Sequence, residues 1–172
     1  MHPSASAWEQ AQQLLKAYAH GQRRFSRWNL AGCDLRGASL TDSDLRGACL
    51  AGANLQEAQL DRAILAGADL TNADLARASL QDTVLAYADL TDAVLEDADL
   101  SAADLVGACF TGANLAGATL QAAYATAADF SGARLEGADF TCTDLEEACL
   151  DDGFEEVVLR LEDPVVPVPS GS

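Results

Sequence analysis

Hydrophobic residues recur at every fifth position along most of this chain. From Leu30 to Leu150 the series contains 25 positions, of which 21 are Leu, three are Phe and one is Ala125. The position two residues earlier is almost always Ala. We call these two positions the central residue and the inward Ala of each five-residue unit.

A period of five excludes the two common regular structures. In an α-helix, a step of five residues turns about 500°, so successive central residues would move around the helix by about 140° and form no apolar stripe. In a flat strand, an odd period would send alternate central residues to opposite faces. The pattern therefore predicts a solenoid, in which each unit is a short side followed by a bend and every central residue points to a common axis.

The small residues of the repeat agree with this prediction. Ten of the 13 glycines stand two residues after a central residue, as Gly32 and Gly67 do. A glycine at this position suits a turn that needs a positive φ. The inward Ala is small because a narrow interior that already holds one large side chain per side has no room for a second. Ala125 is then the weak position of the apolar ladder.

The typical unit, Ala-Asp-Leu followed by two variable residues, appears at residues 68–72 and 88–92. It resembles the repeat of the pentapeptide-repeat proteins: Ser, Thr, Ala or Val, then Asp or Asn, then Leu or Phe, then Ser, Thr or Arg, then Gly. The resemblance covers roughly three quarters of the chain. It implies a right-handed quadrilateral β-helix with four units per coil. We therefore expect an all-β solenoid of about six coils, about 30 Å long at about 4.8 Å per coil.

The solenoid is expected to occupy residues 25–152, with an N-terminal helical cap in residues 1–24. Ser6 and Glu9 have capping-box spacing, Gly21 suits the end of the helix, and the helix is predicted over residues 6–20. A partner-binding or membrane-lying helix is the alternative function of this segment. The apolar face that should cover the end of the solenoid consists of Trp8, Ala11, Leu15 and Tyr18.

Residues 153–172 are expected to form a C-terminal cap and tail. Val157, Leu159 and Leu161 alternate with Glu156, Val158 and Arg160, which is typical of a half-buried strand that could close the sheet edge of the last coil. The three prolines that follow predict an extended, disordered tail.

The formal net charge of −17 arises on the solenoid, where residues 29–152 contain 22 acidic residues against five arginines. Over the expected length this is about one negative charge per 1.8 Å, close to the value of about one per 1.7 Å for duplex DNA. The family that the repeat resembles includes dimeric proteins that bind DNA gyrase in place of DNA. Their helical C-terminal dimerisation module and interrupting loops are missing here. Alternatively, the acids are repeat chemistry, since ten of them stand directly before a central residue.

Stacking positions 20 apart separates two sides of different character. The side around Leu65, Leu85 and Leu105, which we call the apolar side, is a candidate protein-contact face formed by Ile64, Val84, Tyr87, Val106 and Tyr124. Its alternative role is cross-strand stacking within the sheet. The side around Leu70, Leu90 and Phe110, which we call the acidic side, would be the mimic face, with Asp69, Asp89, Asp92, Asp129, Asp151 and Asp152.

These patterns predict a non-enzymatic scaffold that binds another protein, with mimicry of DNA toward a type II topoisomerase as the alternative. Catalysis is disfavoured because a convex rod offers no pocket for paired carboxylates. No cofactor or metal is expected, since His2 and His20 are the only histidines and lie outside the repeats. We expect a cytoplasmic monomer or weak homodimer that neither binds nucleic acid directly nor enters a membrane.

Overall fold

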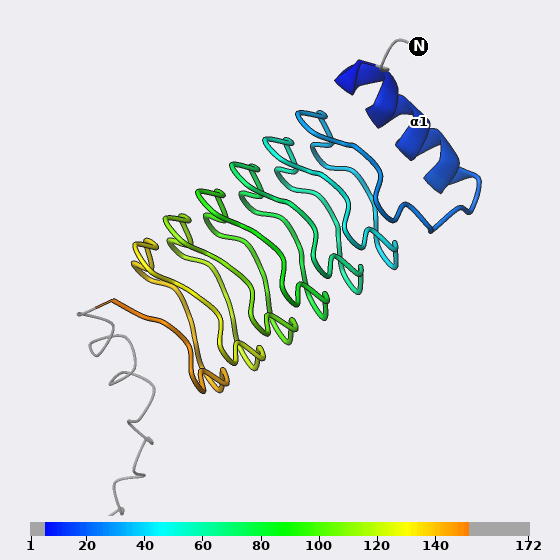
Figure 1. The fold of residues 1–172 in the computed structure, drawn as a ribbon. Helices are drawn as coiled ribbons and strands as arrows, with labels where there is room; N and C mark the ends of the chain where they lie inside the picture. The colour runs from blue at the N-terminus through cyan, green and yellow to red at the C-terminus, as the bar shows by residue number, and fades with distance from the viewer. Residues whose placement is uncertain (1–5, 152–172) are drawn as a thin grey trace, which may run out of the picture.

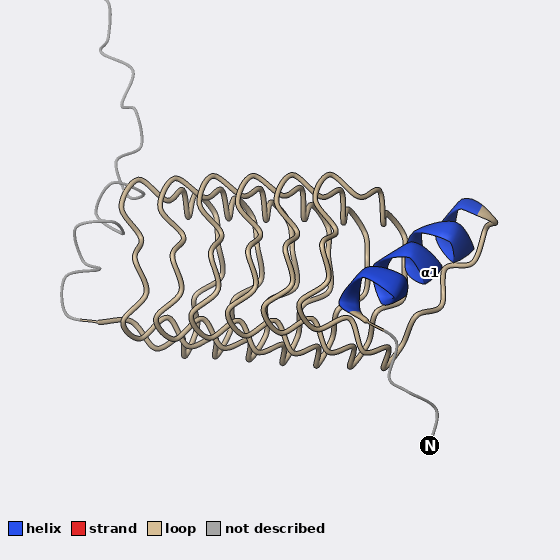
Figure 2. Ribbon diagram, turned by 90° about the horizontal axis from the view of Figure 1, so that it is seen from above, coloured by secondary structure: helices blue, strands red, loops and turns tan. Residues whose placement is uncertain are grey.

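The computed structural model describes residues 6–151, which form one helix followed by a rod of stacked coils. Figure 1 shows helix α1 (Ala7–Ala19) at one end of the rod, from which the chain winds along a single axis. In Figure 2, α1 lies across the end of the first coil. Within residues 6–151, α1 is the only element long enough to be delimited as a helix or strand.

Neighbouring coils are joined in one constant register. All 22 isolated parallel β-bridges within the described residues join positions 20 apart, from Arg24 with Asp44 to Asp129 with Cys149. One coil therefore contains four five-residue units, as the resemblance implies. Each side makes a single bridge to the next coil, so the sides are extended but too short to be delimited as strands. The prediction of a four-sided β-helix of about six coils is confirmed.

A tight turn separates the sides. The N–H of each inward Ala donates to the carbonyl of the preceding central residue, as in Ala68 to Leu65 at 2.9 Å. The second residue after each centre has a positive φ, whether it is Gly32 (64°) or Asp82 (55°). Fourteen residues other than glycine adopt this conformation after the central residues 30–145, although it costs an L-residue about 1–2 kcal/mol. The predicted positive φ is confirmed, and the stacking of coils imposes it on any side chain.

The central residues fill the axis of the rod. All of them from Leu30 to Phe130 are buried, together with the inward Ala residues between them. Near the C-terminal end the core is aromatic: the rings of Phe110 and Phe130 stack with centroids 4.9 Å apart, and Phe140 meets Phe130 edge to face at 5.8 Å. Ala125 is fully buried beside this cluster.

Helix α1 covers the N-terminal end of the core. The predicted capping box is confirmed, because Glu9 N–H donates to Ser6 Oγ at 3.3 Å and Ser6 N–H donates to Glu9 Oε2 at 2.8 Å. Cys33 Sγ donates to the carbonyl of Ala7 at 3.1 Å, and Tyr18 Oη donates to the carbonyl of Thr41 at 3.0 Å. These contacts attach both ends of α1 to the first coil.

The predicted buried face of α1 is wrong at Trp8, whose exposed fraction is 71%. Leu14 is fully buried instead, next to the buried Ala11. The helix therefore buries a face shifted by one position, on which Ala7, Leu15 and Tyr18 are half-buried. The physical reason is that Leu14 packs into the same buried apolar cluster as the central residues of the coils.

Some central residues near the C-terminal end of the described chain are less buried than those before them. Leu135, Leu145 and Leu150 are half-buried, whereas the corresponding residues of earlier coils are fully buried. The strand predicted around residues 157–161 lies outside the described residues, as does the tail that follows it.

Replacing Ala125 by Leu is expected to lower the free energy of unfolding by about 1–3 kcal/mol, since Phe130, the next central residue, is larger than the usual Leu. Tyr124 does not occupy this volume, because its side chain is exposed. The same substitution in a Phe130→Leu background should cost less. Denaturant unfolding of the two single variants and the double variant tests this. A gain in stability on Ala125→Leu alone would mean that a void surrounds Ala125.

Candidate functional surfaces

One backbone N–H in each unit finds no carbonyl acceptor in the coils, and an Asp or Asn side chain just before the central residue accepts its hydrogen bond. In a typical unit, four of the five N–H groups donate to backbone carbonyls, either across the turn or to an adjacent coil. The fifth belongs to the first residue after the centre. It donates to the side chain two residues earlier, as in Gln56 to Asn54 Oδ1 at 3.2 Å and Thr71 to Asp69 Oδ1 at 3.1 Å.

All ten Asp residues at this position accept this bond. They are Asp34, Asp44, Asp69, Asp74, Asp89, Asp99, Asp104, Asp129, Asp139 and Asp144. Three asparagines, Asn29, Asn54 and Asn114, accept it equally. Since a neutral Asn makes the same bond, the repeat needs an acceptor here and does not need the charge.

The acidic side contains an interrupted column of carboxylates. β-Bridges place Asp69 beside Asp89, while Cys109 stands between Asp89 and Asp129. Hydroxyls on the same side engage these carboxylates: Thr71 Oγ1 donates to Asp69 at 2.8 Å, and the hydroxyls of the equivalent residues donate to Asp89 and Asp129 at 2.6 Å. Each of these carboxylates is therefore bonded within its own turn.

The other predicted residues of the acidic side lie at turns or beyond them. The Asp92 carboxylate lies over Gly112 of the next coil, where an added Cβ would come within 2.5 Å of Oδ1. Asp151 Oδ2 accepts the N–H of Gly132 at 2.6 Å. Asp152 lies outside the described residues.

Local hydrogen bonds favour the ionised form of two acidic-side carboxyls. The hydroxyl and backbone N–H of Thr71 hold the pKa of Asp69 below its usual value, and those of Ser131 do the same for the pKa of Asp129. The pKa of Asp139, on a different side, is lowered in the same way by Thr141. The hydrogen bonds that hold the turns together therefore also favour the negative charge of Asp69 and Asp129 on the acidic side.

All five arginines between residues 29 and 151 form ion pairs, and none of these pairs includes a carboxylate of the acidic side. The pairs are Arg36–Asp34, Arg46–Asp44, Arg62–Asp42, Arg77–Glu57 and Arg134–Glu136. As far as the described residues extend, the charge of the acidic side is therefore uncompensated.

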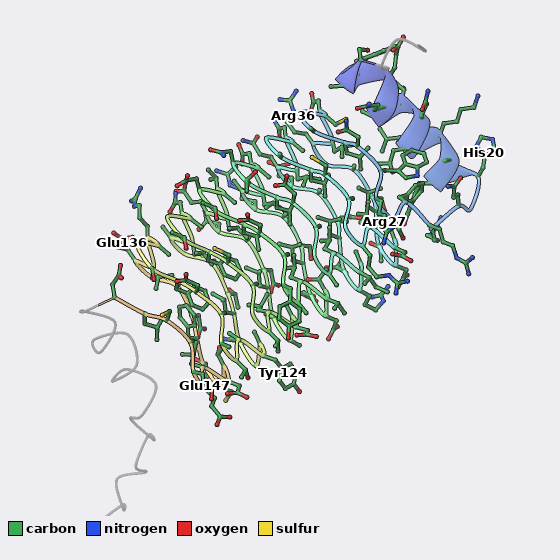
Figure 3. The ribbon with its side chains drawn as sticks, in the orientation of Figure 1. His20, Arg27, Arg36, Tyr124, Glu136 and Glu147 are labelled. Atoms are coloured by element: carbon green, nitrogen blue, oxygen red, sulfur yellow. The ribbon has the colours of Figure 1, made fainter. Side chains whose placement is uncertain are left out.

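The apolar side has two exposed tyrosines. The exposed fractions are 73% for Tyr87 and 58% for Tyr124, and the remaining large exposed hydrophobic residue of the described chain is Trp8 on α1. Figure 3 shows Tyr124 pointing away from the rod along the edge that also carries Glu147, opposite the edge of Glu136. Ile64 and Val84 bridge each other and are half-buried.

The structure places the two tyrosines differently. Tyr87 stands at a turn and its ring lies against Gly107 of the next coil, where an added Cβ would come within 2.6 Å of Cε1. The backbone of Tyr124 forms a β-bridge with that of Asp104, and the residue lines an open hollow of about 340 Å³. The hollow is lined by Asp82, Thr83, Val84, Ala102, Asp104, Val106, Tyr124 and Thr126.

The sequence predicted three of these lining residues as contact residues, Val84, Val106 and Tyr124, and placed Asp104 in the same column, but it did not identify Asp82 and Ala102. Asp82 and Ala102 belong to the turns that precede the apolar side. Asp82 and Ala102 are 20 residues apart, so their turns stack on successive coils next to the column of Val84, Asp104 and Tyr124. This spacing is the sequence signal that could have identified them.

The described residues contain no group of three or more His, Cys, Asp or Glu side chains suited to hold a metal ion. Within the same part of the chain, no helix has the length and apolarity needed to cross a membrane.

The comparison with protein families agrees with this architecture. The model of pentapeptide repeats matches residues 24–56, 53–83, 78–117 and 118–152, with eight copies. The chain therefore belongs to the pentapeptide-repeat family, and its fold is the right-handed quadrilateral β-helix with an N-terminal helix.

Solved structures of the same family are similar to this chain. The pentapeptide repeat protein Rfr23 from the cyanobacterium Cyanothece 51142 is 25% identical, with a TM-score of 0.55 over 81% of this chain and 98% of that chain. The protein alr5209 from Nostoc PCC 7120 is 31% identical over 74% of this chain and 93% of that chain, with a TM-score of 0.48.

The plasmid-mediated fluoroquinolone resistance protein QnrB1 is 22% identical over 75% of this chain and 74% of that chain, with a TM-score of 0.38. That similarity is too distant to carry a functional argument. None of the curated proteins matches the chain significantly.

The depressed pKa values of Asp69, Asp129 and Asp139 predict a pH-dependent contribution to stability. A carboxyl with a lower pKa in the folded state stabilises fully above its unfolded pKa of about 3.9 and loses that contribution as the pH falls through the folded pKa. Wild-type protein should therefore lose stability below about pH 4 relative to a triple Asn variant at these positions.

The Asn side chains keep the turn bond to Oδ1 but lose the bonds that Thr111 and Gln121 donate to Oδ2 of Asp129 and Asp139. The change of the stability difference with pH, and not its size at one pH, therefore reports the ionisation of the three carboxyls. Unfolding free energies at constant salt from pH 6 to pH 2 provide the measurement. A difference between the two proteins that stays constant over this range would contradict the prediction.

Proposed function

We propose that the protein is a non-enzymatic scaffold that binds a partner protein along its apolar side, through Ile64, Val84, Tyr87, Val106 and Tyr124. The observation that carries the proposal is the exposure of Tyr87 and Tyr124 on a rod whose other outward positions are mostly small, polar or acidic. Burying a tyrosine ring at an interface stabilises binding through its large area, while the hydroxyl retains a polar partner.

Stacking within the sheet explains Ile64 and Val84 without a partner, because they bridge each other and are half-buried. It does not explain the two tyrosines. Tyr124 is 58% exposed, and Tyr87, whose ring lies against a glycine at a turn, is 73% exposed, so both side chains keep most of their surface in water. The tyrosines therefore distinguish a contact surface from a structural column.

Replacing Tyr87 and Tyr124 together by Ser is expected to abolish binding of a partner captured from the native cell while changing the melting temperature little. The same variant should abolish any self-association seen by analytical ultracentrifugation. Trp8→Ser is the matched control, since it removes an equally exposed aromatic side chain from α1.

Ile64→Asp with Val84→Asp tests the half-buried part of the surface. Retention of the partner by the tyrosine variant would contradict the proposal.

Mimicry of DNA toward a type II topoisomerase is the second candidate. The observation that favours it is the uncompensated acidic side, where Asp69, Asp89 and Asp129 have no arginine among their described neighbours. A cation-lined DNA channel would be attracted to such a column.

On the mimicry hypothesis, wild-type protein inhibits DNA gyrase supercoiling at micromolar concentration, and a variant with Asn at positions 69, 89 and 129 inhibits much less. The Asn variant keeps the turn bonds and removes three charges, so a change in inhibition reports charge rather than folding. Absence of inhibition by the wild-type protein at micromolar concentration would exclude this function.

A further inference from the structure

We propose that the hollow beside Tyr124 binds an arginine side chain of the partner protein. This inference rests on the proposed scaffold function and specifies the chemistry that the apolar side recognises. The hollow combines apolar walls, an exposed aromatic ring and two aspartates, neither of which forms an ion pair within the described residues.

Asp104 is an acidic residue on the apolar side, within the column formed by Ile64, Val84, Asp104 and Tyr124. β-Bridges place it between Val84 on one coil and Tyr124 on the next. Its Oδ1 accepts the N–H of Val106 at 3.2 Å, and no other hydrogen bond to this carboxylate occurs among the described residues. Oδ2 is therefore available to a ligand in the hollow.

Asp82 supplies a second carboxylate from the preceding turn, where its φ is 55°. The cation of the adjacent turn, Arg62, is hydrogen-bonded to Asp42, with Nε at 2.8 Å and Nη2 at 3.1 Å from the two carboxylate oxygens, and attracts Asp82 only as a weaker, longer-range charge. As far as residues 6–151 show, neither Asp82 nor Asp104 forms an ion pair.

A second hollow, beside α1, shows the contrast. It has a volume of about 720 Å³ and is lined in part by Asp34, Arg36 and Glu57. There the chain supplies its own cation, because Arg36 Nη2 lies 2.8 Å from Asp34 Oδ2. The hollow beside Tyr124 is thus the one of these two that offers carboxylates to a cation from outside.

Arginine fits the remaining features better than lysine. Its aliphatic stem can cover Val84 and Val106, its planar guanidinium can stack on the Tyr124 ring, and its paired N–H groups match a carboxylate. A lysine ammonium is a compact, strongly hydrated charge and gains less from the ring. A volume of about 340 Å³ accommodates one such side chain.

The repeat itself provides a conservative variant for the test. Asp104→Asn removes the charge but keeps an acceptor for the Val106 N–H, as Asn54 and Asn114 do at equivalent positions. Asp139→Asn is the matched control, because it makes the same change at the same position of a unit on a different side of the rod. Melting curves verify that both variants are folded.

The experiment is an NMR titration of the full chain with the peptide acetyl-Gly-Arg-Gly-amide, and with versions containing Lys or the neutral citrulline. We expect saturable shifts at the amides of Val84, Val106 and Tyr124. Asp104→Asn should weaken binding about three- to five-fold, the upper part of the range for a partly exposed ion pair, and Asp139→Asn less than about two-fold. The Lys peptide should bind more weakly, and the citrulline peptide should not bind measurably.

Equal weakening by both Asn variants, or shifts spread along the whole rod, would overturn the proposal in favour of general attraction to an acidic protein. Its failure is distinguishable from failure of the scaffold function. If Tyr87→Ser with Tyr124→Ser abolishes capture of the partner but Asp104→Asn has no effect on the peptide, the scaffold function stands and the arginine site is wrong. If the peptide binds as expected but the tyrosine variant retains the partner, the arginine site stands and the scaffold surface is wrong.

Discussion

The hydrogen-bond ladder between coils is the interaction on which the rest of this structure depends. Its constant register requires every coil to follow nearly the same path, so each unit must provide one large inward side chain, one small one and one residue with positive φ. Asp82 and Ala122 adopt the left-handed conformation, which is strained for residues other than glycine, so the folded state must supply a larger stabilisation at these turns. The hydrogen bonds and apolar burial of each coil offset that local cost.

The fold could be predicted because the ladder leaves a periodic trace in the sequence. The period of five excludes helix and flat strand, and the four-unit coil was available from the resemblance to a family of known cross-section. The end of the rod was harder to predict. Ala11, Leu15 and Tyr18 are compatible with either of two overlapping helical faces, and hydrophobicity alone favours the one that contains Trp8. The geometry of the first coil instead buries Leu14 and leaves Trp8 in water.

The candidate surfaces were only partly predictable, for a related reason. Stacking equivalent positions of successive coils correctly placed Ile64 beside Val84 and Asp69 beside Asp89, because those pairs follow from the backbone register. The hollow depends on how side chains of different length lie on neighbouring coils. The ring of Tyr87 packs against Gly107, whereas Tyr124 is exposed at the border of the hollow. The five-residue period is the same at both positions and does not distinguish them.

Residues that depart from the repeat can also determine at which coil a partner protein binds. A rod with identical coils would present the same surface once per coil, so a partner could bind in several registers displaced by one coil. The column contributes one side chain per coil, in the order Asp44, Ile64, Val84, Asp104, Tyr124 and Asp144, and this order is not reproduced when the column is shifted by one coil. Displacing a partner by one coil would bring its apolar group onto a carboxylate or its cation onto an aliphatic side chain, and either mismatch leaves a desolvated polar group unpaired. The residues that break the repeat on the apolar side can therefore fix the register of a bound protein, which the acidic side, with its recurring Asp and hydroxyl residues, cannot do as sharply.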